Sequence, residues 1–319
     1  MKFLITGGAG FIGSHLAEKL LKAGNKVSII DNLSTGKFSN IVHLTENKDF
    51  SYKIDSILNY SLLEKLIKEC DHIYHLAAAV GVKYIIDNPL LSLKTNISGT
   101  ENVLELANKY KKKVLVASTS EIYGKSDKIP FKETHDRLLG STYISRWSYS
   151  SAKAIDEFLA LAYYREKKLP VVIVRCFNTV GPRQTGQYGM VIPKFIKDAL
   201  LNHPITIYGD GKQTRCFGYV DDVVNGMIKL MNTKKAEGEI FNIGNDKPIS
   251  IEALAKKIKT MTNSRSKIEY IKYEDAYEEG FEDMRQRQPD LTKIKNTIGY
   301  KPLYNLDRIL KIIINYFEE

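Results

Sequence analysis

The first 177 residues alternate between short apolar runs and longer stretches with apolar residues at helical spacing. The apolar runs predict strands at 2–6, 26–31, 72–77, 113–118 and 170–175. The helical spacing predicts helices at 11–23, 60–69, 89–110 and 149–167. Strands that alternate with helices of this length are joined by right-handed crossovers, so the pattern predicts a parallel, doubly wound α/β sheet.

The pattern changes after residue 177. Residues 177–193 are rich in Gly, Pro and polar side chains, which is typical of a loop shaped around a ligand. Further elements are predicted as helices near 192–202, 221–232 and 250–262 and as strands at 205–211 and 239–243. We therefore predict two domains, 1–177 and 178–319. The second is a smaller C-terminal α/β lobe that binds substrate, and some segments are exchanged between the two.

Composition restricts the class of protein. With 43% hydrophobic and 26% charged residues, the chain is typical of a globular protein. A net charge of +10 raises the question of nucleic acid, but the densest basic run, 111–113, falls between a helix and a strand, where a solvated turn is expected. No apolar run is long enough to cross a membrane. Cys70, Cys176 and Cys216 are scattered, which favours a reducing, cytoplasmic location over disulfides or a metal site.

The turn after the first strand, GGAGFIG at 7–13, is expected to bind a dinucleotide. Glycines there permit a tight turn, close approach of a pyrophosphate and close helix packing. Asp31 ends the second strand, where a carboxylate accepts ribose hydroxyls and repels a 2′-phosphate, so NAD is favoured over NADP. Asp55 could hold the adenine amino group or cap a strand end, and the small residues after 75 could leave room for a cofactor or simply pack. The predicted cofactor contacts are Gly7, Gly10, Phe11, Ile12, Gly13, Asp31, Asn32, Asp55, Leu76, Ala77 and Ala78.

A second group of polar residues predicts chemistry at the end of the strand at 113–118. Thr119, Ser120 and Glu121 follow that strand, and ligands bind at the carboxyl ends of parallel strands. Tyr149 and Lys153 are four residues apart and so share one helix face. A nearby ammonium and a nicotinamide cation are expected to lower the pKa of Tyr149, so that the phenol can exchange a proton with a sugar hydroxyl.

The motifs TGGAGFIG, HLAA, NISGT, STSEIYG, YSSAK, FNTVGPR and YGDGKQTRCFGYVDD, in this order, resemble the extended short-chain dehydrogenase/reductases that modify nucleotide sugars. The resemblance spans essentially the whole chain. It implies a Rossmann-type fold, a bound NAD and transient oxidation of the sugar at C4. It also implies that Tyr149 is the base, that Lys153 holds Tyr149 and the nicotinamide ribose, and that Thr119 binds near O4. Asn96 joins the cofactor contacts, and a homodimer through the helices at 89–110 and 149–167 is implied.

The same resemblance places the nucleotide diphosphate against the second lobe. Asn178, the 189–194 loop, Arg215 and one of Arg285 and Arg287 are expected to meet it, because planar guanidinium groups bind phosphates in pairs of hydrogen bonds. The full set of predicted substrate contacts is Ser120, Asn178, Arg183, Val191, Lys194, Tyr208, Gln213, Arg215 and Arg287.

Several reactions share this machinery. The loop GPRQTGQYGMVIP resembles 4-epimerases, which also need the fewest extra groups, so we predict a UDP-sugar 4-epimerase acting on UDP-glucuronate or a UDP-hexose. The alternative is a UDP-glucuronate decarboxylase, because Thr-Ser-Glu at 119–121, Arg146-Trp147 and Arg287-Gln288-Pro289-Asp290 resemble that group. A 4,6-dehydratase comes third. A silent NAD-binding sensor is disfavoured by the intact Thr119, Tyr149 and Lys153. Glu121 has a structural interpretation too, as a cap or as a partner of Arg146.

Overall fold

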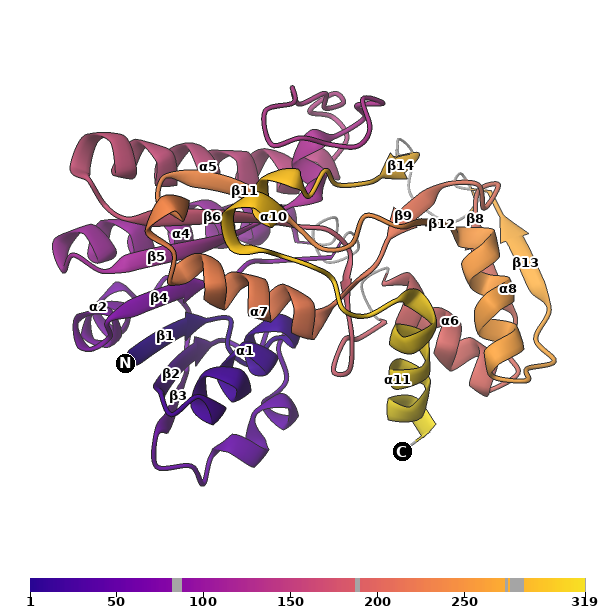
Figure 1. Cartoon of the computed structure of the whole chain (residues 1–319), viewed down its shortest axis with the longest axis horizontal. Helices are drawn as coiled ribbons and strands as arrows, with labels where there is room; N and C mark the ends of the chain where they lie inside the picture. Colours follow the sequence, from indigo (N-terminus) through magenta and orange to yellow (C-terminus); the bar gives the residue numbers. More distant parts are fainter. Residues whose placement is uncertain (82–87, 187–189, 273–274, 276–283, 319) are drawn as a thin grey trace.

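The computed structural model describes residues 1–81, 88–186, 190–272, 275 and 284–318. A seven-stranded sheet dominates the first part of the chain (Figure 1). Its strands are β1 (Lys2–Thr6), β2 (Lys26–Asp31), β3 (Phe50–Ile54), β4 (His72–His75), β5 (Lys113–Thr119), β6 (Val171–Cys176) and β11 (Glu239–Ile243). They pair in parallel in the order β11-β6-β5-β4-β1-β2-β3. The prediction of a parallel, doubly wound sheet is therefore confirmed.

Helices cover both faces of this sheet. They are α1 (Phe11–Lys22), α2 (Tyr60–Glu69), α4 (Pro89–Lys109), α5 (Trp147–Lys167) and α7 (Val220–Met231). Alternate residues of each strand point to opposite faces. On one face Leu4, Ile73 and Val116 pack with apolar residues of α2, α4 and α5. On the other, Ile5, Leu115 and Val174 pack with apolar residues of α1 and α7. The strand order reverses between β1 and β4, which opens a crevice at the carboxyl ends of these strands.

A smaller lobe lies beside the large sheet, on the right in Figure 1. Its helices are α6 (Val191–Leu200), α8 (Ile251–Met261) and α11 (Leu306–Glu318). In its short sheets, β9 (Thr214–Cys216) pairs with β12 (Pro248–Ser250) on one side and with β14 (Gln286–Arg287) on the other. In addition, β13 (Ile268–Ile271) pairs with β8 (Ile205–Tyr208), and β10 (Gly218–Tyr219) pairs with β7 (Thr179–Val180). The described residues also include four short 3₁₀ segments, at Phe38–Asn40, Val42–Leu44, Ser120–Tyr123 and Lys234–Ala236.

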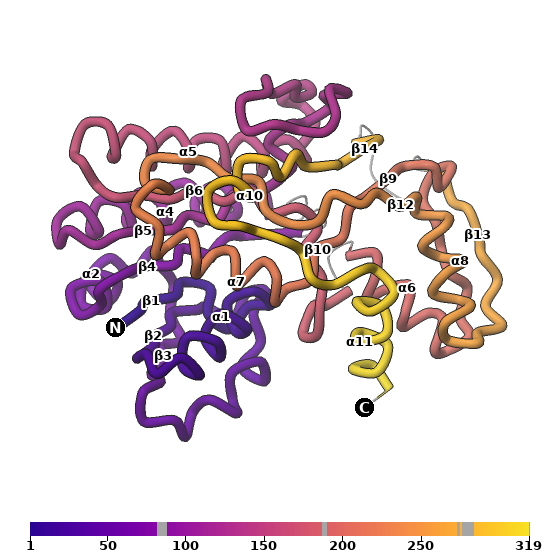
Figure 2. The backbone as a smooth tube through the Cα atoms, viewed as in Figure 1, coloured from indigo at the N-terminus to yellow at the C-terminus, as the bar shows by residue number. Residues whose placement is uncertain are grey.

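The chain crosses between the lobes more than once. Figure 2 shows the yellow trace leaving β14, running beside the large sheet as α10 (Thr292–Ile298), and returning to α11. The strand at 239–243 also joins the large sheet, as the partner of β6. The domain boundary at residue 177 stays a prediction, and β11, α7 and α10 pack on the large sheet from beyond it.

Candidate active site

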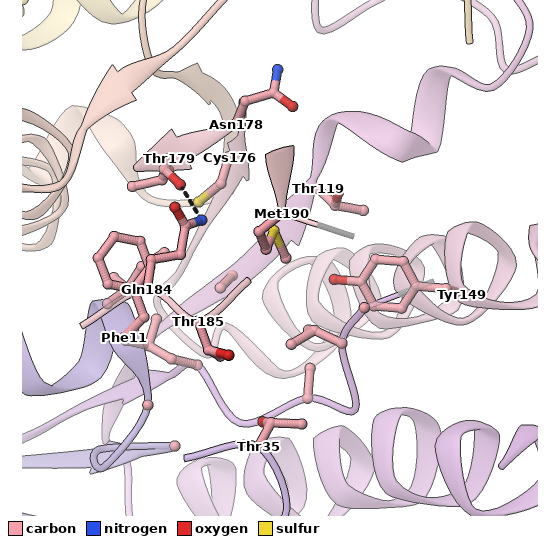
Figure 3. A pocket seen from close by; sticks show the side chains of 18 of the residues that line it. Phe11, Thr35, Thr119, Tyr149, Cys176, Asn178, Thr179, Gln184, Thr185 and Met190 are labelled. Carbon is pink, nitrogen blue, oxygen red and sulfur yellow. Dashed lines mark hydrogen bonds between the residues drawn. The ribbon is translucent and has the colours of Figure 1, made fainter. Parts of the chain in front are cut away.

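A cavity of about 500 Å³ lies at the carboxyl ends of the large sheet, between the two lobes. It has the size of a small-molecule site. Residues from the turn after β1, from β2, β5 and α5, and from the smaller lobe line it, and Figure 3 shows several of them from close by. All the predicted site residues line this cavity except Asn96 and Arg183.

The glycine-rich turn has no room for side chains. A Cβ on Gly7, whose φ is 73°, would lie 2.8 Å from the backbone nitrogen of Ala77. A Cβ on Gly13 would lie 2.2 Å from the Gly7 carbonyl oxygen. Gly10 caps α1, whose first backbone N–H groups attract phosphate oxygens. The turn therefore fits a dinucleotide pyrophosphate.

Asp31 lies at the far end of this groove, and its carboxylate is held in place by the backbone. Its two oxygens accept hydrogen bonds from the backbone N–H groups of Ala9 (2.9 Å) and Leu33 (2.8 Å). Burial raises its pKa, and these hydrogen bonds counteract that effect. A carboxylate oxygen that accepts one N–H can accept a second donor. Asp31 therefore fits the ribose of NAD, while Asp55, which bonds to Ser56 and Asn59, lines the same end of the cavity.

His75 and Asn96 take part in hydrogen bonds that hold the segment 76–79, which lines part of the cavity. The Thr100 hydroxyl donates to the Asn96 carbonyl oxygen (2.7 Å), so His75 Nε2 must donate to Thr100 (2.9 Å). Its Nδ1 then accepts from Thr6 (2.8 Å), whose oxygen accepts from the Ala77 N–H (3.2 Å). The Asn96 amide, predicted to contact the cofactor, instead clamps the backbone of Ala79 in both directions and lies outside the cavity lining. These bonds fix the 76–79 segment.

The buried His75 predicts a specific loss of stability in acid. Burial lowers the pKa of His75 to about 3, so the unfolded chain binds a proton below pH 6.5 that the folded chain does not. This difference should cost about 1.4 kcal/mol of unfolding free energy at pH 5.5 relative to pH 7.5. Urea titrations of His75→Gln should show a pH-dependent loss smaller by that amount, whereas His203→Gln, at an exposed site, should keep the full loss. An equal loss in both variants would contradict this assignment.

Thr119 and Tyr149 meet inside the cavity. Figure 3 shows Tyr149 pointing from α5 into the cavity near Thr119. Desolvation raises the pKa of Tyr149 and the Glu121 carboxylate raises it further, while a hydrogen bond to Thr119 lowers it. Lys153 donates to Asp156 (2.7 Å), and both side chains are buried. The Asp156 charge also raises the pKa of Tyr149, and the lowering of that pKa by the ammonium and a nicotinamide cation stays a prediction.

Glu121 and Arg287 form an ion pair in the lining of the cavity. The two side chains are 3.2 Å apart and only 14% and 11% exposed. Ser150 of α5 donates to the Glu121 carbonyl oxygen (2.8 Å), which fixes the backbone beneath the carboxylate. Arg285 instead makes two 2.9 Å bonds to Asp210 and is 73% exposed. Arg287 thus lines the cavity and Arg285 does not, while the contact of either arginine with the substrate stays a prediction. Arg146, the partner considered for Glu121 at the sequence level, is buried and lines the same cavity.

The smaller lobe closes the other end of the cavity. The predicted contacts Asn178, Val191, Lys194, Tyr208, Gln213 and Arg215 all line it. Arg183 does not, because its guanidinium bonds to Ser14 (3.2 Å) and to Glu18 and so ties the loop after β7 to α1. The lining residues that sequence reasoning missed include Thr35, Gln184, Thr185, Phe195, Thr206 and Phe217. Gln184 and Thr185 directly follow the FNTVGPR motif, which could have indicated them.

Among the described residues, no group of three His, Cys, Asp or Glu side chains could hold a metal ion. None of the helices that the structure describes is both long enough and apolar enough to span a membrane.

A dinucleotide groove that continues into a tyrosine and a lysine on one helix defines a short-chain dehydrogenase/reductase. The family model described as GDP-mannose 4,6 dehydratase matches residues 4–313. The chain belongs to this extended family of NAD-dependent nucleotide-sugar epimerases, decarboxylases and dehydratases. The predicted family, its Rossmann-type fold and its NAD cofactor are thereby confirmed.

The chain is similar over its full length to individual proteins of this family whose reactions are named. A UDP-N-acetyl-alpha-D-glucosaminuronate decarboxylase of Bacillus cytotoxicus is 46% identical over 317 residues, covering 99% of this chain and 97% of the relative. UDP-glucuronic acid decarboxylase 1 of Xenopus tropicalis is 37% identical, covering 100% of this chain and 72% of the relative. The crystal structure of a Bacillus cereus UDP-glucuronic acid 4-epimerase with UDP-glucuronic acid and NAD has a TM-score of 0.90 at 32% identity, covering 100% and 99% of the two chains.

These comparisons change the order of the predicted reactions. The sequence motifs led us to prefer a UDP-sugar 4-epimerase, with a UDP-glucuronate decarboxylase as the alternative. The curated relatives above are decarboxylases, and they support the alternative better than the first choice. The preference arose from the loop after β7, where Arg183 binds α1 and does not line the cavity.

Proposed function

We propose that the protein is a decarboxylase of a UDP-linked hexuronate. It would remove the sugar carboxyl group as CO2 after transient oxidation at C4. UDP-N-acetylglucosaminuronate is the first substrate to test, because the relative named for it is 46% identical over nearly the full length of both chains. UDP-glucuronate is the second, from the relatives at 37% identity. Both substrates carry a carboxylate on C5, next to the carbon that is oxidised.

The Glu121–Arg287 pair carries this proposal. It lines the same cavity as Thr119 and Tyr149, and Glu121 is near enough to raise the pKa of Tyr149, so we place the C5 substituent of a sugar with O4 between those two hydroxyls beside the pair. A planar guanidinium binds a carboxylate through two parallel hydrogen bonds. Arg287 is 11% exposed, and such partial burial strengthens its attraction to a substrate carboxylate. A neutral hexose would have no group to use this cation.

The residues act in a defined order in this proposal. Tyr149 takes the O4 proton, and Thr119 holds O4 in line with the phenol. Bound NAD would supply the hydride acceptor for C4 and a cationic ring that would offset the raised pKa of Tyr149. Lys153, fixed by Asp156, lies one helical turn from Tyr149 and would hold the nicotinamide ribose.

Bond cleavage then needs little help. The 4-keto hexuronate is a β-keto acid, so its C5–C6 bond breaks, CO2 leaves and the electron pair moves onto O4. Thr119 and protonated Tyr149 donate hydrogen bonds to the resulting enolate oxygen. C5 then takes up a proton, and the whole reaction consumes one proton for each CO2 released. Arg287 orients the carboxylate for cleavage, and Glu121 holds the Arg287 guanidinium in place during that step.

A UDP-glucuronate 4-epimerase is the second candidate. Its supporting observation is the full-length similarity to the Bacillus cereus 4-epimerase, at a TM-score of 0.90. Both reactions begin with the same C4 oxidation on a hexuronate. They differ in whether the C5–C6 bond breaks before C4 is reduced again.

Product analysis separates the candidates. The protein is incubated with UDP-N-acetylglucosaminuronate, UDP-glucuronate, UDP-glucose, GDP-mannose and dTDP-glucose, and products are followed by proton NMR. The proposal predicts a UDP-pentose with two protons on C5 from a hexuronate only. A 4-epimer that keeps its carboxylate would overturn it in favour of the second candidate, and a 4-keto-6-deoxy sugar would establish a dehydratase.

We also propose that α4 and α5 pair with the same helices of a second copy to form a homodimer. Leu91 on α4 and Ile155 and Phe158 on α5 are 50%, 40% and 66% exposed, and large exposed apolar side chains on adjacent helices mark an interface. Light scattering should show that Phe158→Arg halves the molecular mass. Leu303→Arg, at an equally exposed apolar site in another part of the chain, should not. A wild-type monomer would refute the interface.

A further inference from the structure

A buried ion pair lies beneath the candidate site, between α5 and β6. Arg175 donates from Nε to Glu157 Oε1 (2.9 Å) and from Nη2 to Glu157 Oε2 (2.7 Å). Both side chains are 6% exposed. Removing two charges from water is costly, and well-packed apolar residues in their place are often at least as stable. Stability alone therefore does not explain why these two charged residues are buried here.

The pair holds the segment that carries Glu121 from both ends. On one side, Ser118 donates its hydroxyl to Glu157 Oε1 (2.6 Å). On the other, Arg175 donates from Nη1 to the Tyr123 hydroxyl (2.9 Å) and lies 4.9 Å from the centre of that ring. Glu121 lies between these two anchors, in the 3₁₀ segment Ser120–Tyr123.

The same network continues to the strand that carries Arg287. The Tyr123 hydroxyl donates to Asn242 Oδ1 (2.7 Å), and the Asn242 amide donates to the Phe131 carbonyl oxygen (2.8 Å). The backbone of Phe131 pairs with Gln288, which follows Arg287 directly, and with Asp290, each at 2.8 Å.

Tyr123 is the link between the two halves. Its hydroxyl accepts from Arg175 on the Glu121 side and donates to Asn242 on the Arg287 side. The ring is fully buried and stacks on Phe131, with centroids 4.5 Å apart and planes 9° from parallel. A phenylalanine could keep this packing while losing both hydrogen bonds.

We propose that Tyr123 is a positioning residue for bond cleavage: through its hydroxyl, the buried network aligns Glu121 with Arg287. This inference rests on the proposed decarboxylation. It makes Tyr123 act on the step after C4 oxidation, because Thr119 and Tyr149 are held by β5 and α5 themselves and do not depend on that hydroxyl.

Tyr123→Phe tests this, with Tyr300→Phe as the matched control. Tyr300 is also buried, and its hydroxyl donates to a backbone carbonyl oxygen, that of Gly244 (2.9 Å), outside the network. In each variant, the rate of CO2 release from a UDP-hexuronate is divided by the rate of C4 oxidation, read as absorbance at 340 nm in a single turnover. We expect the ratio to fall about tenfold in Tyr123→Phe, because phenylalanine keeps the ring packing but loses both hydrogen bonds of the network, and to stay at the wild-type value in Tyr300→Phe.

A double-mutant cycle with Glu121→Gln separates positioning from general loosening of the fold. If Tyr123 acts through Glu121, the two substitutions should be strongly non-additive in this ratio. Ser118→Ala, at the other end of the network, should give the same direction of change. A Tyr123→Phe ratio equal to that of the wild type, or fully additive effects, would overturn the inference. A wild-type protein that oxidises C4 but releases no CO2 would instead contradict the proposed function.

Discussion

Tyr149→Phe is expected to reduce turnover of the UDP-hexuronate by at least about 10²-fold, because the phenol is the proposed acceptor of the O4 proton and such groups contribute 10²–10⁴-fold. The desolvated phenol has a raised pKa and hydrogen-bonds to Thr119, which places it beside the hydroxyl proposed to hold O4. The measurement is initial rate by NMR, together with the affinity for NAD by calorimetry. NAD affinity should change little, since the ring and its packing are retained.

Tyr163→Phe is the matched control for this prediction, because it makes the same change on the same helix outside the cavity lining. It should keep wild-type turnover. If Tyr149→Phe retained more than about a tenth of the wild-type rate, general-base catalysis by this residue would be excluded on the magnitudes that such groups supply.

Glu121→Gln is expected to separate the two halves of the reaction. C4 oxidation should continue, while CO2 release should fall by about 10²-fold, because a neutral amide no longer holds the Arg287 guanidinium by charge. The Glu121 carboxylate also raises the pKa of Tyr149, so its removal should shift the acidic limb of the kcat/KM profile to lower pH. Both readouts come from rates measured between pH 5.5 and 9.

The control is Asp210→Asn. It removes the negative charge from the Asp210–Arg285 pair, which lies in the smaller lobe and outside the cavity lining. It should leave both the CO2 rate and the pH profile unchanged. If Glu121→Gln lowered the oxidation and CO2 rates equally, Glu121 would serve the fold of the 3₁₀ segment and not the cleavage step.

The cofactor half of the site could be predicted from the sequence because its signals are local. Gly7, Gly13 and Asp31 lie within one strand–helix–strand unit, and backbone geometry alone dictates which residues fit there. The contact of Asn96 with the cofactor stays a prediction from its motif, which did not indicate that the Asn96 amide bonds to the Ala79 backbone. That bond depends on a contact between two segments and has no local signature.

The substrate half was predicted less well for physical reasons. Strands β7, β10 and β14 have only two residues each, too few to show a periodic pattern. Arg285 and Arg287 are two residues apart and differ only in their partners in the folded chain, since Arg287 pairs with Glu121 and Arg285 pairs with Asp210. The network through Arg175 and Tyr123 joins residues more than 50 positions apart, so no sequence motif could indicate it.

The fate of the sugar carboxyl carbon tests the central claim most directly. UDP-N-acetylglucosaminuronate labelled with ¹³C at C6 is incubated with the wild-type protein, and the label is followed by ¹³C NMR in a sealed tube. The account predicts that the label appears as CO2 and bicarbonate, in equal amount to a UDP-linked pentose. A label that stays on the sugar, in a hexuronate with inverted configuration at C4, would contradict it.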